Sequence, residues 1–166
     1  ESGSAQICGY LHHHPSARVL IRLFHGNGEI AADYDDLARF YVGCGTSFWV
    51  LDYRGYGRST GEPCFSRMAE DAEAVLADVP AAAGRAGIDP ERILVMGRSL
   101  GSAAAIYLAS AHPDRLHGLL LDSPFAHGPD LIHRIGGPRP AEADLKGLVD
   151  NIDRMRLCRL PTLIIH

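Results

Sequence analysis

The sequence predicts an α/β fold, with a mostly parallel central sheet and helices on both faces. Short runs of consecutive apolar residues alternate with longer stretches in which apolar residues recur at helical spacing, and this alternation is typical of βαβ units. The runs are apolar at successive positions, as strands covered on both faces must be. The chain has 166 residues, of which 46% are apolar and 22% charged, so we expect one domain over residues 1–166.

Six strands are expected along the chain. Residues 5–12 are expected to form an antiparallel strand, and the chain then turns back through residues 13–16. Five apolar runs predict the other strands, which we place at residues 18–24, 46–51, 92–96, 116–121 and 162–165.

Four helices are expected between these strands. The first ends at the glycines of residues 43–45 and shows an apolar face made of Ile30, Tyr34, Leu37, Ala38 and Tyr41. The second carries an apolar stripe made of Met68, Ala72, Val75, Leu76 and Val79. Pro80 is expected to end or kink this helix, because proline lacks the N–H of an interior position. The third, at residues 100–111, consists mostly of small residues that allow close packing on the sheet, and the fourth covers residues 141–155.

The strongest functional signal is the run from Gly97 to Gly101, which reads Gly-Arg-Ser-Leu-Gly. It follows an expected strand directly and opens an expected helix, which is the context of a nucleophile elbow. Glycines two residues on either side remove side chains that would collide with the strand and the helix in such a strained turn. Ser99 is therefore the candidate nucleophile, and the Leu100 N–H can face a developing oxyanion. An ordinary glycine-flanked turn is the simpler alternative.

A second signal, His25-Gly26-Asn27-Gly28, follows the strand at residues 18–24. An oxyanion hole in this architecture takes its second backbone N–H from the loop after an early strand, and glycine lets that backbone approach a substrate. Asn27 is the expected donor. We expect His25 to order the loop rather than to transfer protons.

A third motif covers residues 52–59, which read Asp-Tyr-Arg-Gly-Tyr-Gly-Arg-Ser after the next strand. Its charges and glycines are typical of a loop held by an ion pair and hydrogen bonds, and we interpret the motif as structural.

The order of these motifs resembles the alpha/beta-hydrolase superfamily along nearly the whole chain. Within it, the sequence is most similar to the alpha/beta-hydrolase-domain proteins that include protein depalmitoylases, and next to prolyl-oligopeptidase-like hydrolases. The motifs that carry the resemblance are His25–Gly28, Asp52–Ser59 and Gly97–Ser102. The resemblance implies Ser99 as the nucleophile, with the oxyanion N–H groups supplied by Asn27 and Leu100.

The resemblance also places the remaining triad members outside this chain. The family's catalytic Asp follows the strand that is here residues 162–165, and its His comes one strand later, so both are expected beyond His166. The chain begins without Met and ends in this apolar run, and we expect it to lack the last strand and helix of the fold. His166 belongs to the strand end, and Asp122 is an alternative triad acid.

We expect a serine hydrolase that cleaves carboxylic esters or thioesters through an acyl-enzyme, without metal or organic cofactor. Its substrate is expected to be a small acyl ester or an acylated partner. Residues 123–140 are expected to form a small lid. The apolar lid residues that we expect to face an acyl chain are Phe125, Leu131, Ile132 and Ile135.

Three alternatives remain open. The first is a serine peptidase of the prolyl-oligopeptidase-like type. The second is a dinucleotide-binding turn, because Gly26-x-Gly28-x-x-Ala31 matches G-x-G-x-x-A and Asp52 ends the next strand, where it could bind a ribose hydroxyl. The third is a catalytically inactive hydrolase fold that acts as a binding module.

Composition argues against several other classes of protein. The net charge is −4 and the basic residues are scattered among acidic ones, which does not favour nucleic-acid binding. No apolar stretch approaches the roughly 18 residues that a membrane-spanning helix needs. The four cysteines lie far apart, which favours reduced thiols in the cytoplasm over disulfides or a zinc site.

Two further signals are weak. His12 and His14 could share one face of a strand, but no carboxylate or cysteine accompanies them in the sequence, so we expect a solvated turn rather than a metal site. Cys44 lies between two glycines without a neighbouring base, which does not favour a nucleophilic thiol.

Overall fold

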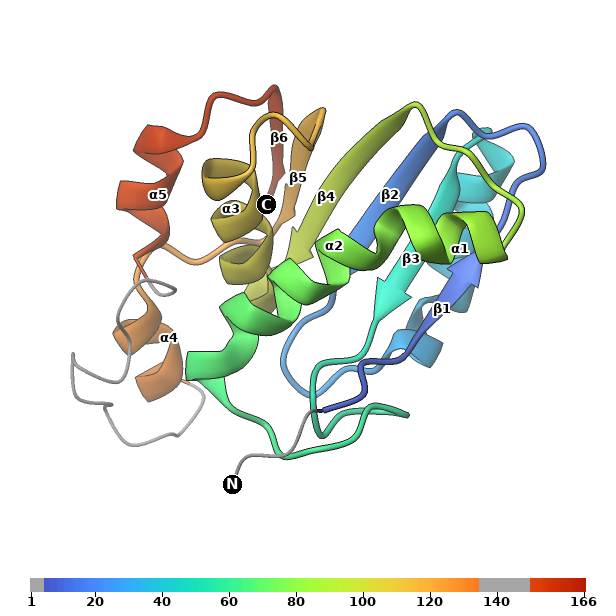
Figure 1. Cartoon of the computed structure of the whole chain (residues 1–166). Coiled ribbons are helices and arrows are strands. Elements are labelled where there is room, and N and C mark those ends of the chain that lie inside the picture. Colours follow the sequence, from blue (N-terminus) through green and yellow to red (C-terminus); the bar gives the residue numbers. More distant parts are fainter. Residues whose placement is uncertain (1–4, 135–149) are drawn as a thin grey trace.

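The computed structural model describes residues 5–134 and 150–166, and within these residues six strands form one sheet in the order β1-β3-β2-β4-β5-β6 (Figure 1). β1 (Gly9–His12) runs antiparallel to β3 (Ser47–Leu51). All other neighbours are parallel, and they comprise β2 (Val19–Phe24), β4 (Arg92–Arg98), β5 (Gly118–Asp122) and β6 (Thr162–Ile165). The predicted mostly parallel sheet is confirmed.

The helices cover both faces of this sheet. One face carries α1 (Asp35–Gly43), which follows the short 3₁₀ helix η1 (Ala31–Tyr34). The other face carries α2 (Met68–Arg85), α3 (Ser102–Ala111) and α5 (Asn151–Leu157) (Figure 1). Short 3₁₀ turns precede two of these helices, namely η2 (Phe65–Arg67) and η3 (Ser99–Gly101), and α4 (Gly128–Arg134) lies in the connection after β5.

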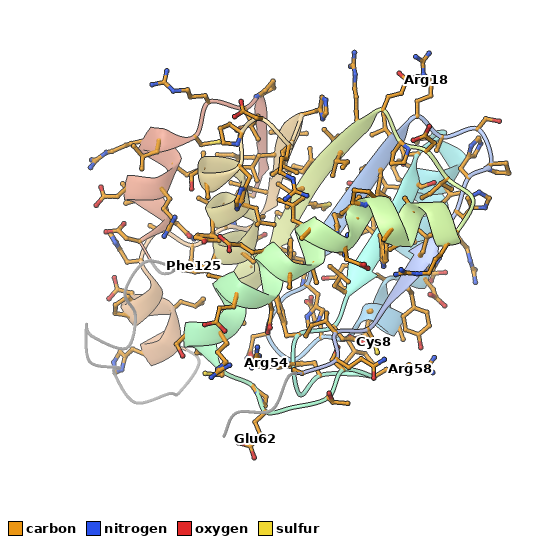
Figure 2. The ribbon with its side chains drawn as sticks, viewed as in Figure 1. Cys8, Arg18, Arg54, Arg58, Glu62 and Phe125 are labelled. Atoms are coloured by element: carbon orange, nitrogen blue, oxygen red, sulfur yellow. The ribbon has the colours of Figure 1, made fainter. Side chains whose placement is uncertain are left out.

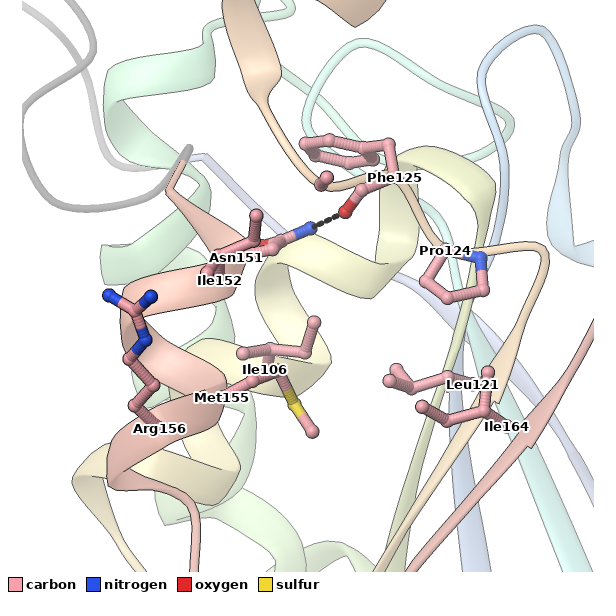
Figure 3. A pocket seen from close by; sticks show the side chains of 10 residues that line it. Ile106, Leu121, Pro124, Phe125, Asn151, Ile152, Met155, Arg156 and Ile164 are labelled. Carbon is pink, nitrogen blue, oxygen red and sulfur yellow. Dashed lines mark hydrogen bonds between the residues drawn. The ribbon is translucent and has the colours of Figure 1, made fainter.

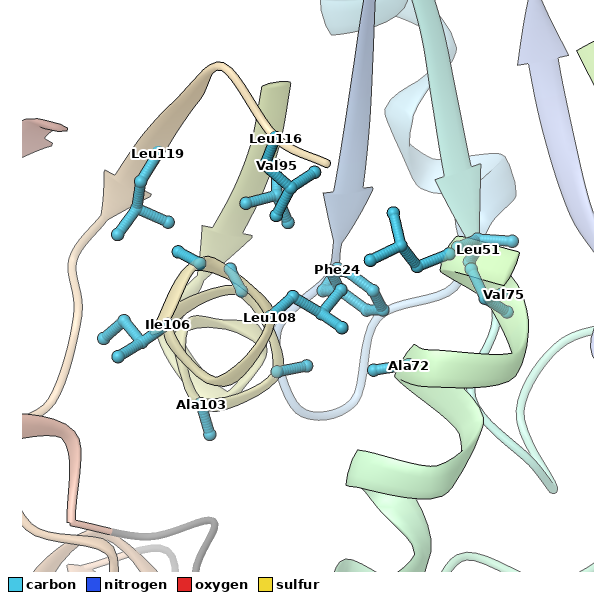
Figure 4. Close-up of a cluster of buried hydrophobic side chains, with 14 of the residues drawn as sticks. Phe24, Leu51, Ala72, Val75, Val95, Ala103, Ile106, Leu108, Leu116 and Leu119 are labelled. Carbon is cyan, nitrogen blue, oxygen red and sulfur yellow. The ribbon is translucent and has the colours of Figure 1, made fainter. Parts of the chain in front are cut away.

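The larger hydrophobic core lies between the sheet and the helices α2 and α3 (Figure 4). Seven of the ten residues of α3 are buried, because this helix contacts β4 and β5 on one side and α2 and α5 on others. Its alanines, Ala103, Ala104 and Ala105, keep the helix close to the strands, as the small residues predicted. A smaller core on the opposite face joins α1 to the sheet.

Pro80 does not end the second helix, which continues to Arg85. A proline at this position has no N–H to donate to the carbonyl of Leu76, four residues earlier. The guanidinium of Arg115 donates to that carbonyl oxygen instead, at 3.0 Å. Of the two expected outcomes, an end or a kink, the end at Pro80 is wrong, and a residue distant in sequence supplies a donor for the Leu76 carbonyl.

The expected apolar face of the first helix is only partly buried. Tyr34 and Ala38 are buried, whereas the exposed fractions of Ile30 and Leu37 are both 37%. The chain changes from a 3₁₀ to an α-helix at Asp35, and the tighter 3₁₀ turn breaks the single helical period on which the prediction depended.

The second half of the helix expected at residues 141–155 overlaps α5, which begins at Asn151. Residues 141–149 lie outside the described residues. The Asp150 side chain accepts a hydrogen bond from the Asp153 N–H at 3.3 Å and so caps α5. The segment at residues 123–140, expected as a lid, contains α4, which the sequence did not predict, and its residues 135–140 are likewise not described.

The last strand, β6, forms an edge of the sheet. The exposed fractions of its side chains Leu163, Ile164 and Ile165 are 54%, 55% and 51%.

Among the helices that the structure describes, none combines the length and the apolar character that crossing a bilayer requires.

Candidate active site

Ser99 lies in a strained turn directly after β4. Its φ is +47°, in the left-handed region that residues other than glycine rarely adopt. A Cβ on Gly97 would lie 2.6 Å from the Cα of Ser102, so only glycine lets the strand pass under its own helix here. These are the features of the predicted nucleophile elbow.

Gly101 has a different neighbour from the one predicted. A Cβ at this position would overlap the carbonyl of Phe24 and lie 2.7 Å from the carbonyl oxygen of His25. The second glycine of the elbow therefore clears the end of the neighbouring strand β2, and not its own strand. This close approach holds the loop of residues 25–28 beside the elbow.

Asn27 and Leu100 line one small cavity of about 120 Å³. The structure thus brings together the two residues whose backbone N–H groups are expected to form the oxyanion hole. The Asn27 side chain is held by Tyr56, whose hydroxyl donates to its Oδ1 at 3.1 Å.

His25 is fully buried, and its ring contacts the ring of Tyr53 at a centroid distance of 4.5 Å. Its Nδ1 lies 2.8 Å from the Gly26 carbonyl oxygen, and the Tyr53 hydroxyl donates to the His25 carbonyl at 2.8 Å. Burial lowers the pKa of His25, although the carbonyl of Gly26 and the carboxylate of Asp52 act in the opposite direction. These contacts suit a residue that orders the loop, as the sequence predicted.

Asp52 holds the third motif together from inside the protein. Its carboxylate accepts hydrogen bonds from the N–H of Ala31 at 2.6 Å and of Arg58 at 3.2 Å, and its exposed fraction is 1%. A buried carboxylate with these partners is not available for a ribose hydroxyl, so the dinucleotide-binding alternative loses its acidic residue. The structural interpretation of this loop is confirmed.

Arg54 attaches the same loop to helix α2. Its guanidinium forms two hydrogen bonds with the Asp71 carboxylate, one of them from Nε at 2.6 Å. Arg54 and Arg58 lie at the end of the molecule where the parallel strands finish, opposite to Arg18 (Figure 2).

Glu29 and Arg98 form an ion pair that sequence analysis missed. Glu29 also accepts hydrogen bonds from the Gly26 N–H, at 2.7 Å, and from the Tyr34 hydroxyl, while the Arg98 Nε donates to Asp122 at 3.1 Å. Burial raises the pKa of Tyr34 to about 12, so its hydroxyl stays protonated and remains a donor. The signal that could have found this cluster is that Glu29, Arg98 and Asp122 each lie at or just beyond the end of a strand in one parallel sheet.

Asp122 is occupied by these contacts. One carboxylate oxygen accepts from Arg98, and the other accepts from the Ser123 hydroxyl at 3.0 Å. This arrangement gives no support to Asp122 as an alternative triad acid.

Ser99 lines a second cavity of about 570 Å³, which also contains Phe125, Leu131 and His166. Phe125 therefore shares a cavity with the candidate nucleophile. Of the other expected lid residues, Ile135 lies outside the described residues, as does the side chain of Ile132.

A third cavity, of about 490 Å³, lies between α3, α5 and the strands β5 and β6 (Figure 3). Phe125 belongs to its wall as well, and the Asn151 amide donates to the Phe125 carbonyl at 2.8 Å.

The other histidine and cysteine signals have ordinary surroundings. His12 Nε2 lies 3.5 Å from an Asp35 carboxylate oxygen, and the Ser16 N–H donates to the His14 ring at 3.2 Å. Over residues 5–134 and 150–166, no group of three or more His, Cys, Asp or Glu side chains is placed to hold a metal ion. All four cysteines are free thiols, and Cys44 is exposed.

A mostly parallel sheet with helices on both faces and a serine in a strained strand-to-helix turn are features of the alpha/beta hydrolases. Residues 14–152 match the model of the serine aminopeptidase S33 family, and the chain belongs to this family. Human alpha/beta hydrolase domain-containing protein 17B is 29% identical over 168 residues, a match that covers 99% of this chain and 54% of that protein. The chain spans about half the length of the curated relatives that it matches.

Solved structures of low sequence identity share the fold. Est1E from Butyrivibrio proteoclasticus, with ferulic acid bound, matches with a TM-score of 0.73 and 18% identity, covering 100% of this chain and 76% of that chain. A monoacylglycerol lipase from Paleococcus ferrophilus matches with a TM-score of 0.64 and 20% identity, covering 96% and 76%. The predicted resemblance to the alpha/beta-hydrolase superfamily is confirmed.

Proposed function

We propose that this chain carries the nucleophile of a serine hydrolase that cleaves carboxylic esters or thioesters. The observation that carries the proposal is the strained backbone of Ser99, with φ at +47°, in the wall of the 570 Å³ cavity. The next residue, Leu100, lines the small cavity that also contains Asn27. Strain of this kind persists where surrounding structure enforces it, and it is common at active sites. The substrate is a small acyl ester or an acylated partner.

In the proposed reaction, the Ser99 Oγ attacks the acyl carbonyl carbon. The carbonyl oxygen becomes negatively charged and accepts hydrogen bonds from the backbone N–H groups of Asn27 and Leu100. The serine proton passes through a histidine to the leaving alcohol or thiol as the old acyl bond breaks. A water then attacks the acyl-enzyme, releases the acid and returns the proton to Ser99.

The histidine and its acidic partner are proposed to lie beyond His166, in the order Ser, then acid, then His. Reading the downstream sequence tests this directly: an Asp is expected shortly after β6, and a His after one further strand. A downstream sequence that lacks both would leave the Ser99 elbow without a base and favour the binding-module alternative. We also propose a cytoplasmic location, which the wide spacing of the four cysteines in the sequence supports.

A fluorophosphonate probe tests the nucleophile in the longest gene product that contains this chain. The probe is expected to label the wild-type protein and to fail with Ser99→Ala, because it reacts with an activated serine. Ser110→Ala is the matched control, since Ser110 lies on α3 with its hydroxyl bonded to the Tyr107 carbonyl, and this variant is expected to label normally. Labelling that survives in Ser99→Ala would refute the assignment.

A second candidate function, peptide hydrolysis, is favoured by the description of the matching family as serine aminopeptidases. The same nucleophile and oxyanion hole serve both reactions, so the substrate decides between them. A series of nitrophenyl esters compared with aminoacyl amides is expected to show faster cleavage of the esters. Faster cleavage of the amides would assign the protein to the peptidases.

A further inference from the structure

Ser123 is a second serine with a strained backbone, and it lies directly after β5. Among the residues that the structure describes, two residues other than glycine have a positive φ, namely Ser99 at +47° and Ser123 at +49°. Pro124 follows Ser123, and a residue before proline ordinarily adopts an extended backbone with a negative φ. The left-handed conformation of Ser123 is therefore unfavourable on two counts, and contacts with the surrounding structure must hold it.

The two serines occupy equivalent places on neighbouring strands. Arg98, the last residue of β4, is the register partner of Asp122, the last residue of β5, and each serine comes next along its strand. Adjacent strands of a sheet lie about 4.8 Å apart, so the sheet brings the backbone of Ser123 close to that of Ser99. Both serines line the same cavity. Ser123 lies on the β5 side of the nucleophile, whereas Asn27 follows β2, on the opposite side.

Hydrogen bonds fix both the backbone and the hydroxyl of Ser123. Its N–H donates to the Ile165 carbonyl oxygen at 2.8 Å, which ties the residue to β6. Its hydroxyl donates to one Asp122 carboxylate oxygen at 3.0 Å, and the Arg98 Nε donates to the other at 3.1 Å. The only proton of the hydroxyl is thereby used, so its oxygen keeps lone pairs for a donor that enters the cavity. Ser123 is exposed, so a ligand in the cavity can reach this oxygen.

We propose that Ser123 is a specificity-determining residue that accepts a hydrogen bond from the alcohol or thiol portion of the substrate. This inference rests on the proposed function of Ser99 as the nucleophile. The histidine that protonates the leaving atom is proposed to follow β6, which pairs with β5 and not with β2. The leaving portion therefore lies on the side of Ser123. The favoured substrates are esters or thioesters whose leaving portion carries an O–H or N–H close to the scissile bond.

Two esters of one acyl group test this assignment in the longest gene product that contains this chain. The hydroxyethyl ester offers an O–H to Ser123, whereas the methoxyethyl ester has an oxygen at the same place but no proton to donate. Both esters form the same acyl-enzyme, so a difference between them appears in kcat/KM. For the wild-type protein, kcat/KM of the hydroxyethyl ester is expected to exceed that of the methoxyethyl ester by about three- to tenfold, which corresponds to one neutral hydrogen bond.

Ser123→Gly removes the hydroxyl and keeps the backbone conformation, because glycine adopts a positive φ without strain. This variant is expected to bring the ratio of the two kcat/KM values close to one. Ser123→Ala removes the hydroxyl while the strain remains, and it is expected to give the same ratio, which separates loss of the hydroxyl from release of strain. Ser16→Gly is the matched control, since Ser16 is exposed in the turn before β2 and does not line the cavity, and it is expected to keep the wild-type ratio.

Fluorophosphonate labelling is measured for every variant, so loss of the nucleophile is distinguished from a change in specificity. A wild-type ratio near one, together with normal labelling, would overturn the proposal for Ser123 and leave Ser99 as the nucleophile. An equal fall of kcat/KM for both esters in Ser123→Gly, with the ratio unchanged, would also overturn it, because a purely structural role affects both esters alike. Absence of labelling in the wild-type protein would overturn both proposals.

Discussion

Glu29 connects the loop of the expected oxyanion hole to the nucleophile turn. Its carboxylate accepts from the Gly26 N–H and pairs with Arg98, the residue directly before Ser99. We therefore expect the position of the Asn27 N–H relative to Ser99 to depend in part on the Glu29 side chain.

Glu29→Ala is expected to lower kcat for a short ester by about 10²-fold and to change KM little, because loss of one oxyanion donor costs about 10²–10³ in turnover. The kcat of Glu29→Gln is expected to lie between those of Glu29→Ala and the wild type. Its amide oxygen still accepts a hydrogen bond from the Gly26 N–H, but the neutral amide forms no ion pair with Arg98. Steady-state kinetics measure both values, and Glu62→Gln, in an exposed loop, is the control. An unchanged kcat in Glu29→Ala would contradict the role given to Glu29.

His25 predicts a pH dependence of stability. Burial lowers the pKa of its ring below the ordinary value of 6.5, so the unfolded chain binds more protons at this site once the pH falls below 6.5. The free energy of unfolding is expected to decrease as the pH falls from 6.5, and this contribution levels off below the folded pKa.

Urea unfolding measures this contribution of His25. The measurement runs from about pH 5 to about pH 8, the range in which histidine side chains change charge. His25→Gln is expected to flatten the acidic part of the profile relative to the wild type. His13→Gln, at an exposed position, is expected to keep the wild-type slope. Equal slopes for wild type and His25→Gln would show that other groups cause the dependence.

At the scale of single elements, helix α2 depends on Arg115 to pass Pro80. Arg115→Ala is expected to lower the free energy of unfolding by about 1–2 kcal/mol, because the Leu76 carbonyl loses its donor. The same substitution should cost less in a Pro80→Ala background, where the backbone supplies the missing N–H. Denaturant unfolding of the double-mutant cycle measures the difference, and an equal cost in both backgrounds would contradict the explanation.

The elements that the sequence predicted well are those whose signals are local. Gly97 and Gly101 lie within two residues of Ser99, and the apolar runs of the strands need no distant partner to be recognised. The ion pair of Glu29 and Arg98 has no local signal, since it joins residues 69 positions apart that meet only after β2 and β4 pair, and only the order of the strands could have indicated it.

Helix boundaries were predicted less well for the same reason. The end of α2 depends on Arg115, which is remote in sequence, and the change from 3₁₀ to α-helix at Asp35 removes the uniform period that the prediction assumed. The small cavity lined by Asn27 and Leu100 was not predicted, because its walls come from three separate connections of the sheet.

At the scale of the whole molecule, the edge strand β6 predicts association. Its three apolar side chains, Leu163, Ile164 and Ile165, are each more than half exposed, and none of the strands in residues 5–134 and 150–166 pairs with its outer edge. Residues 1–166 expressed alone are expected to dimerise or aggregate through this edge, and to hydrolyse esters far more slowly than the longer gene product.

Size-exclusion chromatography with light scattering measures the association of residues 1–166. Ile164→Lys is expected to reduce it, because a charge on an edge strand disfavours pairing with another chain. Phe40→Ala, which removes an exposed ring far from β6, is expected to leave it unchanged. A monodisperse monomer that turns over esters at ordinary enzyme rates would contradict both expectations.

The burial of helix α3 on most of its sides has a consequence for how the molecule opens. Amide hydrogens exchange with solvent through local fluctuations where few contacts must break, and through global unfolding where many must. We expect the amides of α3 and of the central strands β2 and β4 to exchange last, and those of β1 and β6, at the sheet edges, to exchange early. Ser99 lies where β4 meets the turn that leads into α3, so the nucleophile is carried by the part of the chain that opens last while the outer segments fluctuate around it.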